Sequence, residues 1–438
     1  MLEKIAVFWY RRDLRLYDNH AFYQALTSGL QVLPVFIFDK DILKELGAKD
    51  DARLSFIRSE VQNLKTAFEE KGSSLITFHG KPKDAFEQLV KDFEVEKVFC
   101  NKDYEPYGSQ RDKEVIRFLD KNEIEFLQFK DHVIFEEDEV VKEDGEPYTV
   151  YTPYSKTWKK AFEKLEVPYY DCENHFDKLL PVSSPLNMPK LKDLGFVKSE
   201  LDFPSAHISK DIIQNYAELR DIPAVRGTSR LGIHLRFGTI SIRELVKVAA
   251  ELSEVFLNEL IWREFYTTIL WHFPRVVAES FRPKYDFIQW RNDENEFKKW
   301  CKGETGYPMV DAGMRELNET GFMHNRVRMI TASFLTKHLL IDWRWGEAYF
   351  AEKLLDFELS SNNGNWQWAA GTGCDAAPYF RIFNPEEQQK KFDAEKKYIS
   401  KWVPEYDSKD YFQPMVEHKL ARARALNAYK AAVKEEDE

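Results

Sequence analysis

The sequence predicts two domains: an N-terminal α/β domain with a doubly wound, Rossmann-like parallel sheet, and a larger all-α domain after it. At 438 residues the chain is too long for one ordinary hydrophobic core. Strand-like runs alternate with helical patterns in the first part, and after about residue 208 only helical periodicity continues. We therefore predict an α/β domain over 1–130, a connection over 131–205 and an all-α domain over 206–430.

The elements of the first domain follow in order along the chain. Between the second and third strands, Leu54, Ile57, Val61, Leu64 and Phe68 recur at steps of three and four, which is one face of a helix. Alternation of strands and helices predicts a parallel sheet covered on both faces. No G-x-G-x-x-G fingerprint follows the first strand, so an ordinary NAD-binding domain is not expected. The predicted strands are residues 5–10, 32–38, 75–78, 97–100 and 124–129.

The connection is the segment in which this alternating pattern is lost. From about residue 136 to 205 it is rich in proline, serine and lysine, which favour turns and extended chain. We expect a long interdomain connection that contains short helices.

Composition narrows the function classes. The formal net charge is −11, with 63 Lys and Arg against 74 Asp and Glu, so nucleic-acid binding requires a basic face on an acidic body. The four cysteines form no C-x-x-C pair. We therefore expect neither a disulfide framework nor a zinc site, assign no metal ligands, and favour a reducing cytoplasm. The apolar stretch near the N-terminus is far too short for a signal peptide or a membrane span.

The segment Arg226-Gly-Thr-Ser-Arg230 is the first of three that could carry chemistry. Backbone N–H groups and hydroxyls near the start of a helix can hold a phosphate. The alternative is a plain helix N-cap, in which a hydroxyl only satisfies the first turn.

The second is the predicted helix through residues 258–266. Glu259, Trp262, Arg263 and Tyr266 fall at i, i+3, i+4 and i+7, so they share one face. A solvated face seldom includes Trp, and a core face seldom includes Glu and Arg. The pattern therefore favours the wall of a polar and aromatic cavity, with a structural Glu259–Arg263 bridge over a packed Trp as the alternative.

The third is the segment 356–368. The run Asn362-Asn-Gly364 opposes helix formation in the middle of an otherwise helical region. We predict an interrupted helix here, and because an interruption costs stability, we expect its amides to bind a ligand. The alternative is a turn that connects two helices.

Longer motifs resemble the photolyase/cryptochrome family, and most closely its class I photolyases, which repair cyclobutane pyrimidine dimers. Residues 9–19 match the family's N-terminal signature, and residues 216–418 resemble its flavin-binding domain, so the resemblance covers nearly the whole chain. The most specific motifs are Gly227-Thr-Ser-Arg-Leu231, Trp262-Arg-Glu-Phe-Tyr266, Thr305-Gly-Tyr-Pro-Met-Val-Asp-Ala312, Met323-His-Asn-Arg326, Asn362-Asn-Gly-Asn-Trp-Gln-Trp368 and Phe380-Arg-Ile-Phe-Asn-Pro385.

The resemblance implies FAD as a cofactor, folded at the centre of the all-α domain. Arg328 and Asp356 resemble the family's ion pair beside the isoalloxazine ring, and Asn362 resembles the residue that faces flavin N5. Plant cryptochromes carry an acid at that position, and an amide favours the anionic reduced flavin that can donate an electron for repair. Phe256 stands where some relatives have a Trp near the flavin phosphates, so an indole donor is lost there. The other cofactor-binding residues that we assign are Tyr216, Thr228, Ser229, Arg230, Leu231, Arg263, Asn325 and Glu358.

The resemblance also implies a pocket for a pyrimidine dimer that is flipped out of DNA. Glu259, a catalytic candidate, would bond a thymine carbonyl as negative charge develops on it. Trp262 and Trp368 would supply stacking faces. Asn325 and Met329, at i and i+4, would present an amide and a thioether together. Relatives that repair (6-4) photoproducts carry histidine in place of Asn325, so the amide favours the cyclobutane dimer.

Three tryptophans match the family's electron relay from the flavin to the surface. By resemblance Trp366, Trp343 and Trp290 form this chain, and we assign them as catalytic residues. The alternative is that all three are ordinary core residues, because Trp is usually buried.

The expected activity is that of a deoxyribodipyrimidine photo-lyase acting on damaged DNA. Arg226, Arg381 and Lys391 are candidates for gripping DNA phosphates, and each could equally be a solvated charge. We expect a monomer with no membrane association.

The runner-up is a cryptochrome-type photoreceptor, although such proteins usually append a long C-terminal tail, and this chain continues only about twenty residues past Val416. A small-molecule electron-transfer flavoprotein is disfavoured because no nicotinamide fingerprint is present.

A second, antenna chromophore is common on the N-terminal domain of this family. Folate-binding relatives carry a Glu near the position of Gly108, which this chain lacks, and residues 101–108 resemble the deazaflavin-type relatives. The choice among deazaflavin, folate, a flavin and no antenna stays open.

Overall fold

The computed structural model describes residues 3–182 and 187–434, and the chain divides into two compact units. The first unit combines residues 1–136, 164–207 and 231–248, and the second combines 137–163, 208–230 and 249–438. These units divide the predicted connection between them. Residues 137–163 belong with the helical unit, whereas 131–136 and 164–205 belong with the sheet. Residues 231–248, predicted to be part of the all-α domain, also belong with the sheet.

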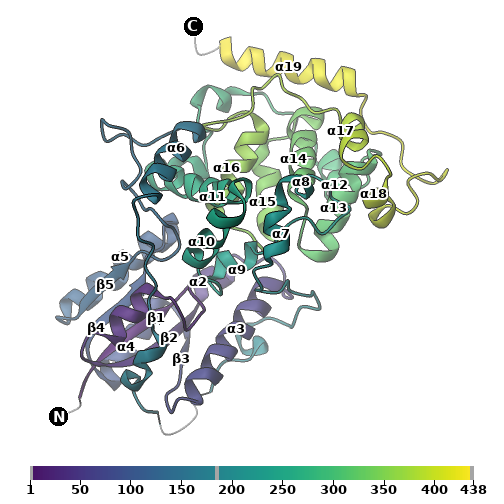
Figure 1. The fold of residues 1–438 in the computed structure, drawn as a ribbon. Coiled ribbons are helices and arrows are strands. Elements are labelled where there is room, and N and C mark those ends of the chain that lie inside the picture. The colour runs from purple at the N-terminus through teal and green to yellow at the C-terminus, as the bar shows by residue number, and fades with distance from the viewer. Residues whose placement is uncertain (1–2, 183–186, 435–438) are drawn as a thin grey trace. The chain divides into compact units, whose positions relative to one another are not determined.

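The first unit is built on a five-stranded parallel sheet with the strand order β3-β2-β1-β4-β5 (Figure 1). All five predicted strands are present. Their register places Val7 opposite both Leu33 and Val98, so β1 lies at the centre of the sheet. The strands are β1 Lys4–Tyr10, β2 Gln31–Asp39, β3 Ile76–Gly80, β4 Glu94–Asn101 and β5 Glu125–Phe129.

Helices cover both faces of this sheet because both faces of β1 are apolar. Trp9 meets Phe86 edge-on at 5.2 Å on one face. On the other face Phe8 stacks on Phe22 at 4.9 Å. Successive side chains of a strand point to opposite faces, so this central strand is a continuous apolar run. The helices around the sheet are α1 His20–Leu26, α2 Lys40–Lys44, α3 Ala52–Glu69, α4 Pro82–Asp92 and α5 Pro106–Lys121, with the short turns η1 Glu173–Lys178 and η2 Leu191–Leu194.

Buried ion pairs explain why residues 231–248 belong to the first unit. Asp131 accepts from Arg15 at 2.7 Å and from Arg243 at 2.8 Å. Burial alone would raise the pKa of Asp131, but the two guanidinium groups hold it below its ordinary value. Arg236 pairs with Glu105 at 2.6 Å. This segment contains α9 Gly232–Phe237 and the start of α10 Ile242–Leu252.

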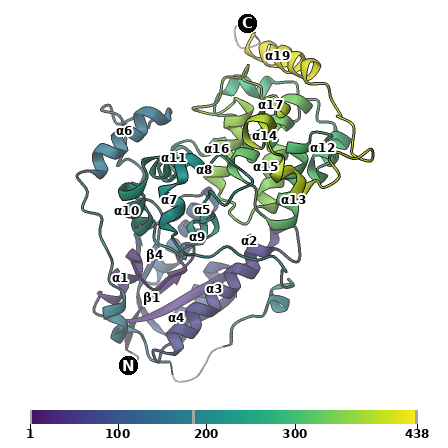
Figure 2. The ribbon, with the colours of Figure 1, turned by 45° about the vertical axis from the view of Figure 1, so that its right-hand side comes forward.

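The second unit is helical, as predicted, and in its described part the only strand-like pairing is an isolated bridge between Val141 and Pro147. α12, α13 and α14 lie next to one another in two views (Figures 1 and 2). Within the described residues, none of the helices combines the length and apolar character needed to cross a membrane. The helices are α6 Tyr151–Phe162, α7 Lys210–Gln214, α8 Tyr216–Leu219, α11 Glu254–His272, η3 Pro274–Val277, η4 Pro283–Phe287, α12 Glu294–Lys302, α13 Pro308–Thr320, α14 Asn325–Ser333, η5 Phe334–Leu339, α15 Trp343–Lys353, α16 Leu359–Ala370, α17 Pro385–Phe392, α18 Lys397–Trp402 and α19 His418–Lys434.

Candidate active site

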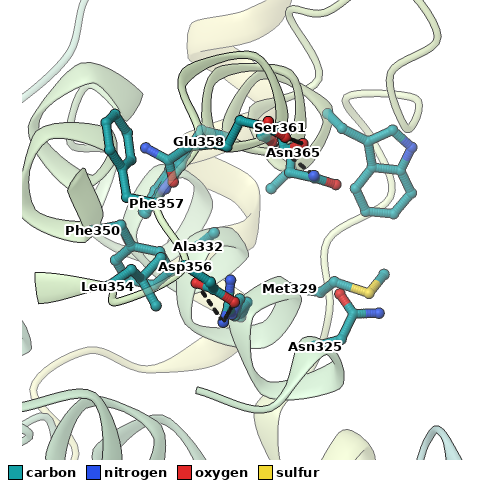
Figure 3. Close-up of a pocket in the computed structure, with 15 residues that line it drawn as sticks. Asn325, Met329, Ala332, Phe350, Leu354, Asp356, Phe357, Glu358, Ser361 and Asn365 are labelled. Atoms are coloured by element: carbon teal, nitrogen blue, oxygen red, sulfur yellow. Dashed lines mark hydrogen bonds and ion pairs between the residues drawn. The ribbon is translucent and has the colours of Figure 1, made fainter. Parts of the chain in front are cut away.

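A pocket in the second unit lies between α14, the end of α15, α16 and the chain that joins the last two (Figure 3). The empty space in this pocket and in the solvent at its mouth is about 620 Å³. Asn325 and Met329 lie together at one end, across from Phe350 and Leu354. The structure thus brings together residues that the sequence placed on separate motifs. The predicted site residues that line the pocket are Asn325, Arg328, Met329, Asp356, Glu358, Asn362, Trp366 and Trp368.

The predicted Arg328–Asp356 ion pair is present in this pocket. Nη2 of Arg328 donates to Oδ2 of Asp356 at 2.8 Å and to Oδ1 at 3.2 Å. Nε of Arg328 donates to the carbonyl of Met323 at 2.7 Å, which fixes the plane of the guanidinium. Both side chains remain partly exposed, at 27% and 21%. The pair therefore presents a donor and an acceptor side by side to a ligand.

Asn362 is oriented by an acid that sequence reasoning missed. Its Nδ2 donates to Oε1 of Glu347 at 2.7 Å and to the Glu347 carbonyl at 3.1 Å. Both amide hydrogens are then used, so Oδ1 is the atom left to accept a hydrogen bond. Burial raises the pKa of Glu347, and the bond from Asn362 opposes that rise. The sequence signal was weak, because Glu347 is a single acid beside aromatic residues on α15.

The segment that carries Asn362 is a continuous helix, α16, so the predicted interruption is wrong. Three poor helix formers in a row are tolerated because each has a tertiary role. Asn362 bonds Glu347, and Asn363 donates from Nδ2 to the carbonyl of Val276 at 2.9 Å. A Cβ on Gly364 would lie 2.2 Å from Cδ1 of Tyr266, so only glycine allows α16 to approach α11 this closely.

Gly364→Ala tests this close approach. Helix propensity alone predicts a gain of about 1 kcal/mol for Ala over Gly inside a helix. We expect the opposite, a loss of about 1–3 kcal/mol, because the new methyl group overlaps the Tyr266 ring. Thermal unfolding of both proteins measures the difference, and a raised melting temperature would contradict the packing described here.

α11 carries Glu259 and Arg263 on one face, as predicted, but they have other partners. Glu259 pairs with Arg220 at 2.5 Å, and Arg263 pairs with Glu358 at 2.8 Å. The alternative Glu259–Arg263 bridge is therefore wrong. Burial raises the pKa of Glu259, and Arg220 opposes that rise. Arg220 was missed, although its spacing of four from Tyr216 on one helical turn is a signal that could have found it.

The cofactor-binding residues assigned at 216 and 228–231 lie in α8 and in the loop that leads into α9. Tyr216 is buried and meets Phe256 edge-on at 5.0 Å. Phe256, which stands where some relatives have a Trp, is therefore an apolar packing partner of Tyr216. α9 has Leu231 at its N-cap and no side-chain cap. The N-cap residue is therefore neither Thr228 nor Ser229. Leu231 itself belongs to the first compact unit.

Arg230 has a backbone conformation that side chains rarely adopt, with a φ of 55°. Its guanidinium lies over the ring of Phe322, 4.3 Å from the centroid. This cation–π contact places a positive charge beside the loop that holds Thr228 and Ser229.

Trp366 is buried against α15. A Cβ on Gly346 would lie 2.1 Å from the indole, so this glycine makes room for it. Trp366 meets Phe350 edge-on at 4.9 Å and Trp300 at 6.1 Å. Trp300 was not among the predicted relay residues.

The other two predicted relay residues lie in different surroundings. Trp343 is fully buried at the start of α15, and its indole N–H has no hydrogen-bond partner. Trp290 is half-buried and meets Tyr429 edge-on at 6.0 Å. Trp366 and Trp343 are buried and Trp290 is partly exposed, so Trp290 is the member of the predicted relay that reaches the surface.

The three residues assigned to DNA phosphates are all exposed. Arg226 lies in the loop after α8, Arg381 in the segment after α16, and Lys391 near the end of α17. Exposure fits phosphate contacts and solvated charges equally, so it does not decide between them.

Comparison with known proteins identifies the family. Residues 6–171 match the family described as DNA photolyase, and residues 256–408 match the FAD binding domain of DNA photolyase. A deoxyribodipyrimidine photo-lyase from Synechococcus sp. is 36% identical over 475 residues, covering 98% of each chain. The chain belongs to the DNA photolyase family. The deoxyribodipyrimidine photo-lyase of Escherichia coli is 38% identical to this photolyase-family chain over 471 residues. The match covers 97% of this chain and 98% of the Escherichia coli protein.

Solved structures share the fold of this family member. A class III photolyase from Agrobacterium tumefaciens superimposes with a TM-score of 0.87 at 32% identity, over 99% and 98% of the two chains. An archaeal photolyase from Sulfolobus tokodaii, described as having two FAD molecules that imply a novel light-harvesting cofactor, has a TM-score of 0.82 at 33% identity, over 97% and 99%. A cryptochrome from Synechocystis sp. has a TM-score of 0.87 at 25% identity, over 98% and 99%. The fold alone therefore does not separate repair from photosensing.

The pocket residues fit a flavin. The match to the FAD binding domain, 256–408, contains all of the pocket-lining residues. The polar edge of an isoalloxazine ring alternates carbonyl oxygens with N–H groups. Arg328 supplies a donor, Asp356 an acceptor and Asn362 a second acceptor at Oδ1, while Trp366 and Phe357 contribute aromatic lining.

Proposed function

We propose that this chain is a deoxyribodipyrimidine photo-lyase, a carbon–carbon lyase that uses light to split cyclobutane pyrimidine dimers in DNA. The observation that carries the proposal is the single pocket in which the Arg328–Asp356 pair, the oriented amide of Asn362 and the Asn325–Met329 helix face meet. The relatives that bear this enzyme's name support it over nearly their whole length.

The assigned site residues have two proposed roles, and the first is to hold the cofactor. When bound, reduced FAD would supply the light-driven electron transfer that splits the dimer. Arg328 and Asp356 orient the polar edge of the flavin. Asn362, whose Nδ2 is held by Glu347, would accept a hydrogen bond from the flavin through Oδ1. The groups assigned to the rest of FAD are Tyr216, Thr228, Ser229, Arg230, Leu231, Arg263, Asn325 and Glu358.

The second group receives the flipped dimer. Trp262 and Trp368 offer stacking faces, and Asn325 and Met329 approach from α14. Glu259 acts on a thymine carbonyl. A carboxylate only accepts hydrogen bonds, so the raised pKa of Glu259 matters because the protonated acid can donate to that oxygen.

Bound flavin is the first expected result. The purified protein should be yellow or blue and release about one FAD per chain on denaturation. We also propose a second chromophore; the Sulfolobus tokodaii structure supports a flavin, and deazaflavin and folate remain the other candidates. Chromatography of the released pigments measures both. A colourless, well-folded protein that takes up no added FAD contradicts the proposal.

A repair assay separates this function from that of a cryptochrome, for which the Synechocystis structure is the supporting observation. Chemically reduced enzyme is mixed with an oligonucleotide that carries one thymine dimer and is illuminated with near-ultraviolet or blue light. We expect dimers to disappear only in the light. Reduction of the flavin by light with no loss of dimer would favour the photoreceptor.

Damaged DNA is the proposed partner, so affinity should fall steeply with salt despite the net charge of −11. Lys391→Ala should lower the slope of log affinity against log salt by about one, since it removes one phosphate contact. Lys298→Ala is the control, because Lys298 is exposed and pairs with Glu294. Equal slopes for all three proteins would remove Lys391 from the DNA interface.

We also propose that the protein acts as a monomer in the cytoplasm. Its four cysteines are free thiols, which fits a reducing compartment. Light scattering with and without DNA measures the oligomeric state.

A further inference from the structure

Tyr151 lies flat on Trp262, an aromatic contact that the sequence did not suggest. The two ring centroids are 3.7 Å apart and the planes differ by 5°. Tyr151 begins α6, in a segment that the sequence assigned to the interdomain connection but that belongs to the second compact unit. A parallel contact at this distance covers one face of the indole.

Three further contacts fix the orientation of Tyr151. Its hydroxyl donates to the carbonyl of Asn258 at 2.9 Å, and its backbone N–H donates to Oδ2 of Asp375 at 3.0 Å. Phe265 meets the ring edge-on at 5.9 Å. Tyr151 is therefore attached both to α11, which carries Trp262, and to the segment that follows Trp368.

α6 as a whole is braced against α11. Tyr154 is fully buried and packs on Phe265 at 5.2 Å. The indole N–H of Trp158 donates to Oε1 of Glu264 at 2.5 Å. Tyr151, Tyr154 and Trp158 fall at i, i+3 and i+7, so one face of α6 makes all these contacts. Moving Tyr151 away from Trp262 would disturb this whole interface.

We propose that Tyr151 is a positioning residue for the lesion: it backs one face of Trp262, so that a flipped pyrimidine stacks on the opposite face. This inference rests on the proposed repair function. The backing ring keeps the indole in one orientation before the lesion arrives, which lowers the cost of ordering it on binding. Tyr151 contacts Trp262 and does not line the pocket that holds Asn362 and Trp366, so it acts on lesion binding rather than on electron transfer.

Tyr151→Leu and Tyr151→Phe test the stack. Affinities for an oligonucleotide with one thymine dimer and for the undamaged strand are measured in the dark, and repair per absorbed photon is measured with the dimer saturated. Tyr151→Leu should lower dimer affinity about tenfold, within the range for base–aromatic stacking, and leave undamaged-strand affinity, bound FAD and repair per bound dimer unchanged. Tyr151→Phe keeps the ring, so its affinity for the dimer should be within about twofold of the wild-type affinity.

Tyr148→Leu is the matched control. Tyr148 belongs to the same segment, but it contacts Tyr154 at 6.3 Å and the hydroxyl of Thr157 at 3.0 Å. Unchanged dimer affinity in Tyr151→Leu would overturn the inference. So would equal losses in Tyr151→Leu and Tyr148→Leu with a lower melting temperature, because they would mean general destabilisation of α6. An unchanged protein that repairs no dimer refutes the proposed function itself, which is a separate result.

Discussion

Trp366→Phe should abolish the light-driven reduction of oxidised flavin and leave repair by chemically reduced enzyme intact. The two reactions use different paths, because one moves an electron from indoles to the flavin and the other moves it from the flavin to the lesion. Trp366 is buried between Gly346 and Phe350, and phenylalanine keeps an aromatic ring in that space. The fold and bound FAD should therefore persist, as absorbance and thermal unfolding will show.

The next relay residue is decided by two further variants. The family resemblance routes the electron through Trp343, whereas the ring contacts of Trp366 join it to Trp300. We expect Trp343→Phe to block photoreduction and Trp300→Phe to retain it. The reverse result would move the relay to Trp300. Photoreduction at the normal rate in Trp366→Phe would remove all of these residues from the path.

Glu259→Ala should lower repair per absorbed photon several-fold and leave FAD bound. A hydrogen bond to a charged group is worth roughly 1.5–3 kcal/mol, and this bond counts most while negative charge develops on the dimer carbonyl. Arg220 loses its partner in this variant, but the side chains of the pair are 25% and 31% exposed. The loss of stability should therefore be about 1 kcal/mol or less.

The control for this variant is Glu254→Ala on the same helix, where Glu254 pairs with Lys159 and is 75% exposed. It should change neither repair nor stability. If flavin occupancy and melting temperature fall in Glu259→Ala while repair per bound flavin holds, Glu259 belongs to the scaffold.

The pH dependence of repair gives an independent test of Glu259. Burial raises its pKa, and only the protonated acid can donate to a carbonyl, so the yield should fall as pH rises through that raised pKa. Glu259→Gln carries a neutral donor at every pH and should lose this dependence. Yields are compared at constant flavin occupancy and ionic strength. A wild-type profile that matches the Gln variant would mean that protonation of Glu259 plays no part.

Local periodicity in the sequence was enough to determine the strands of the sheet and which residues share a face on several helices. Consecutive apolar residues such as Phe8 and Trp9 define a strand with two buried faces, and the structure places that strand at the centre of the parallel sheet. A spacing of four places Asn325 and Met329 on one face of α14, and Glu259 and Arg263 on one face of α11. These features depend on neighbours along the chain, which a sequence displays directly.

Only the tertiary structure decided which partner each polar group takes and which helices tolerate poor helix formers. Arg220 rather than Arg263 pairs with Glu259, Glu347 orients Asn362, and Tyr151 backs Trp262. Each contact joins positions that are between 15 and 111 residues apart in the chain, so no local pattern announces it. The continuity of α16 has the same cause, because the close approach of Gly364 to Tyr266 and the long-range bonds of its asparagines outweigh their low helix propensity.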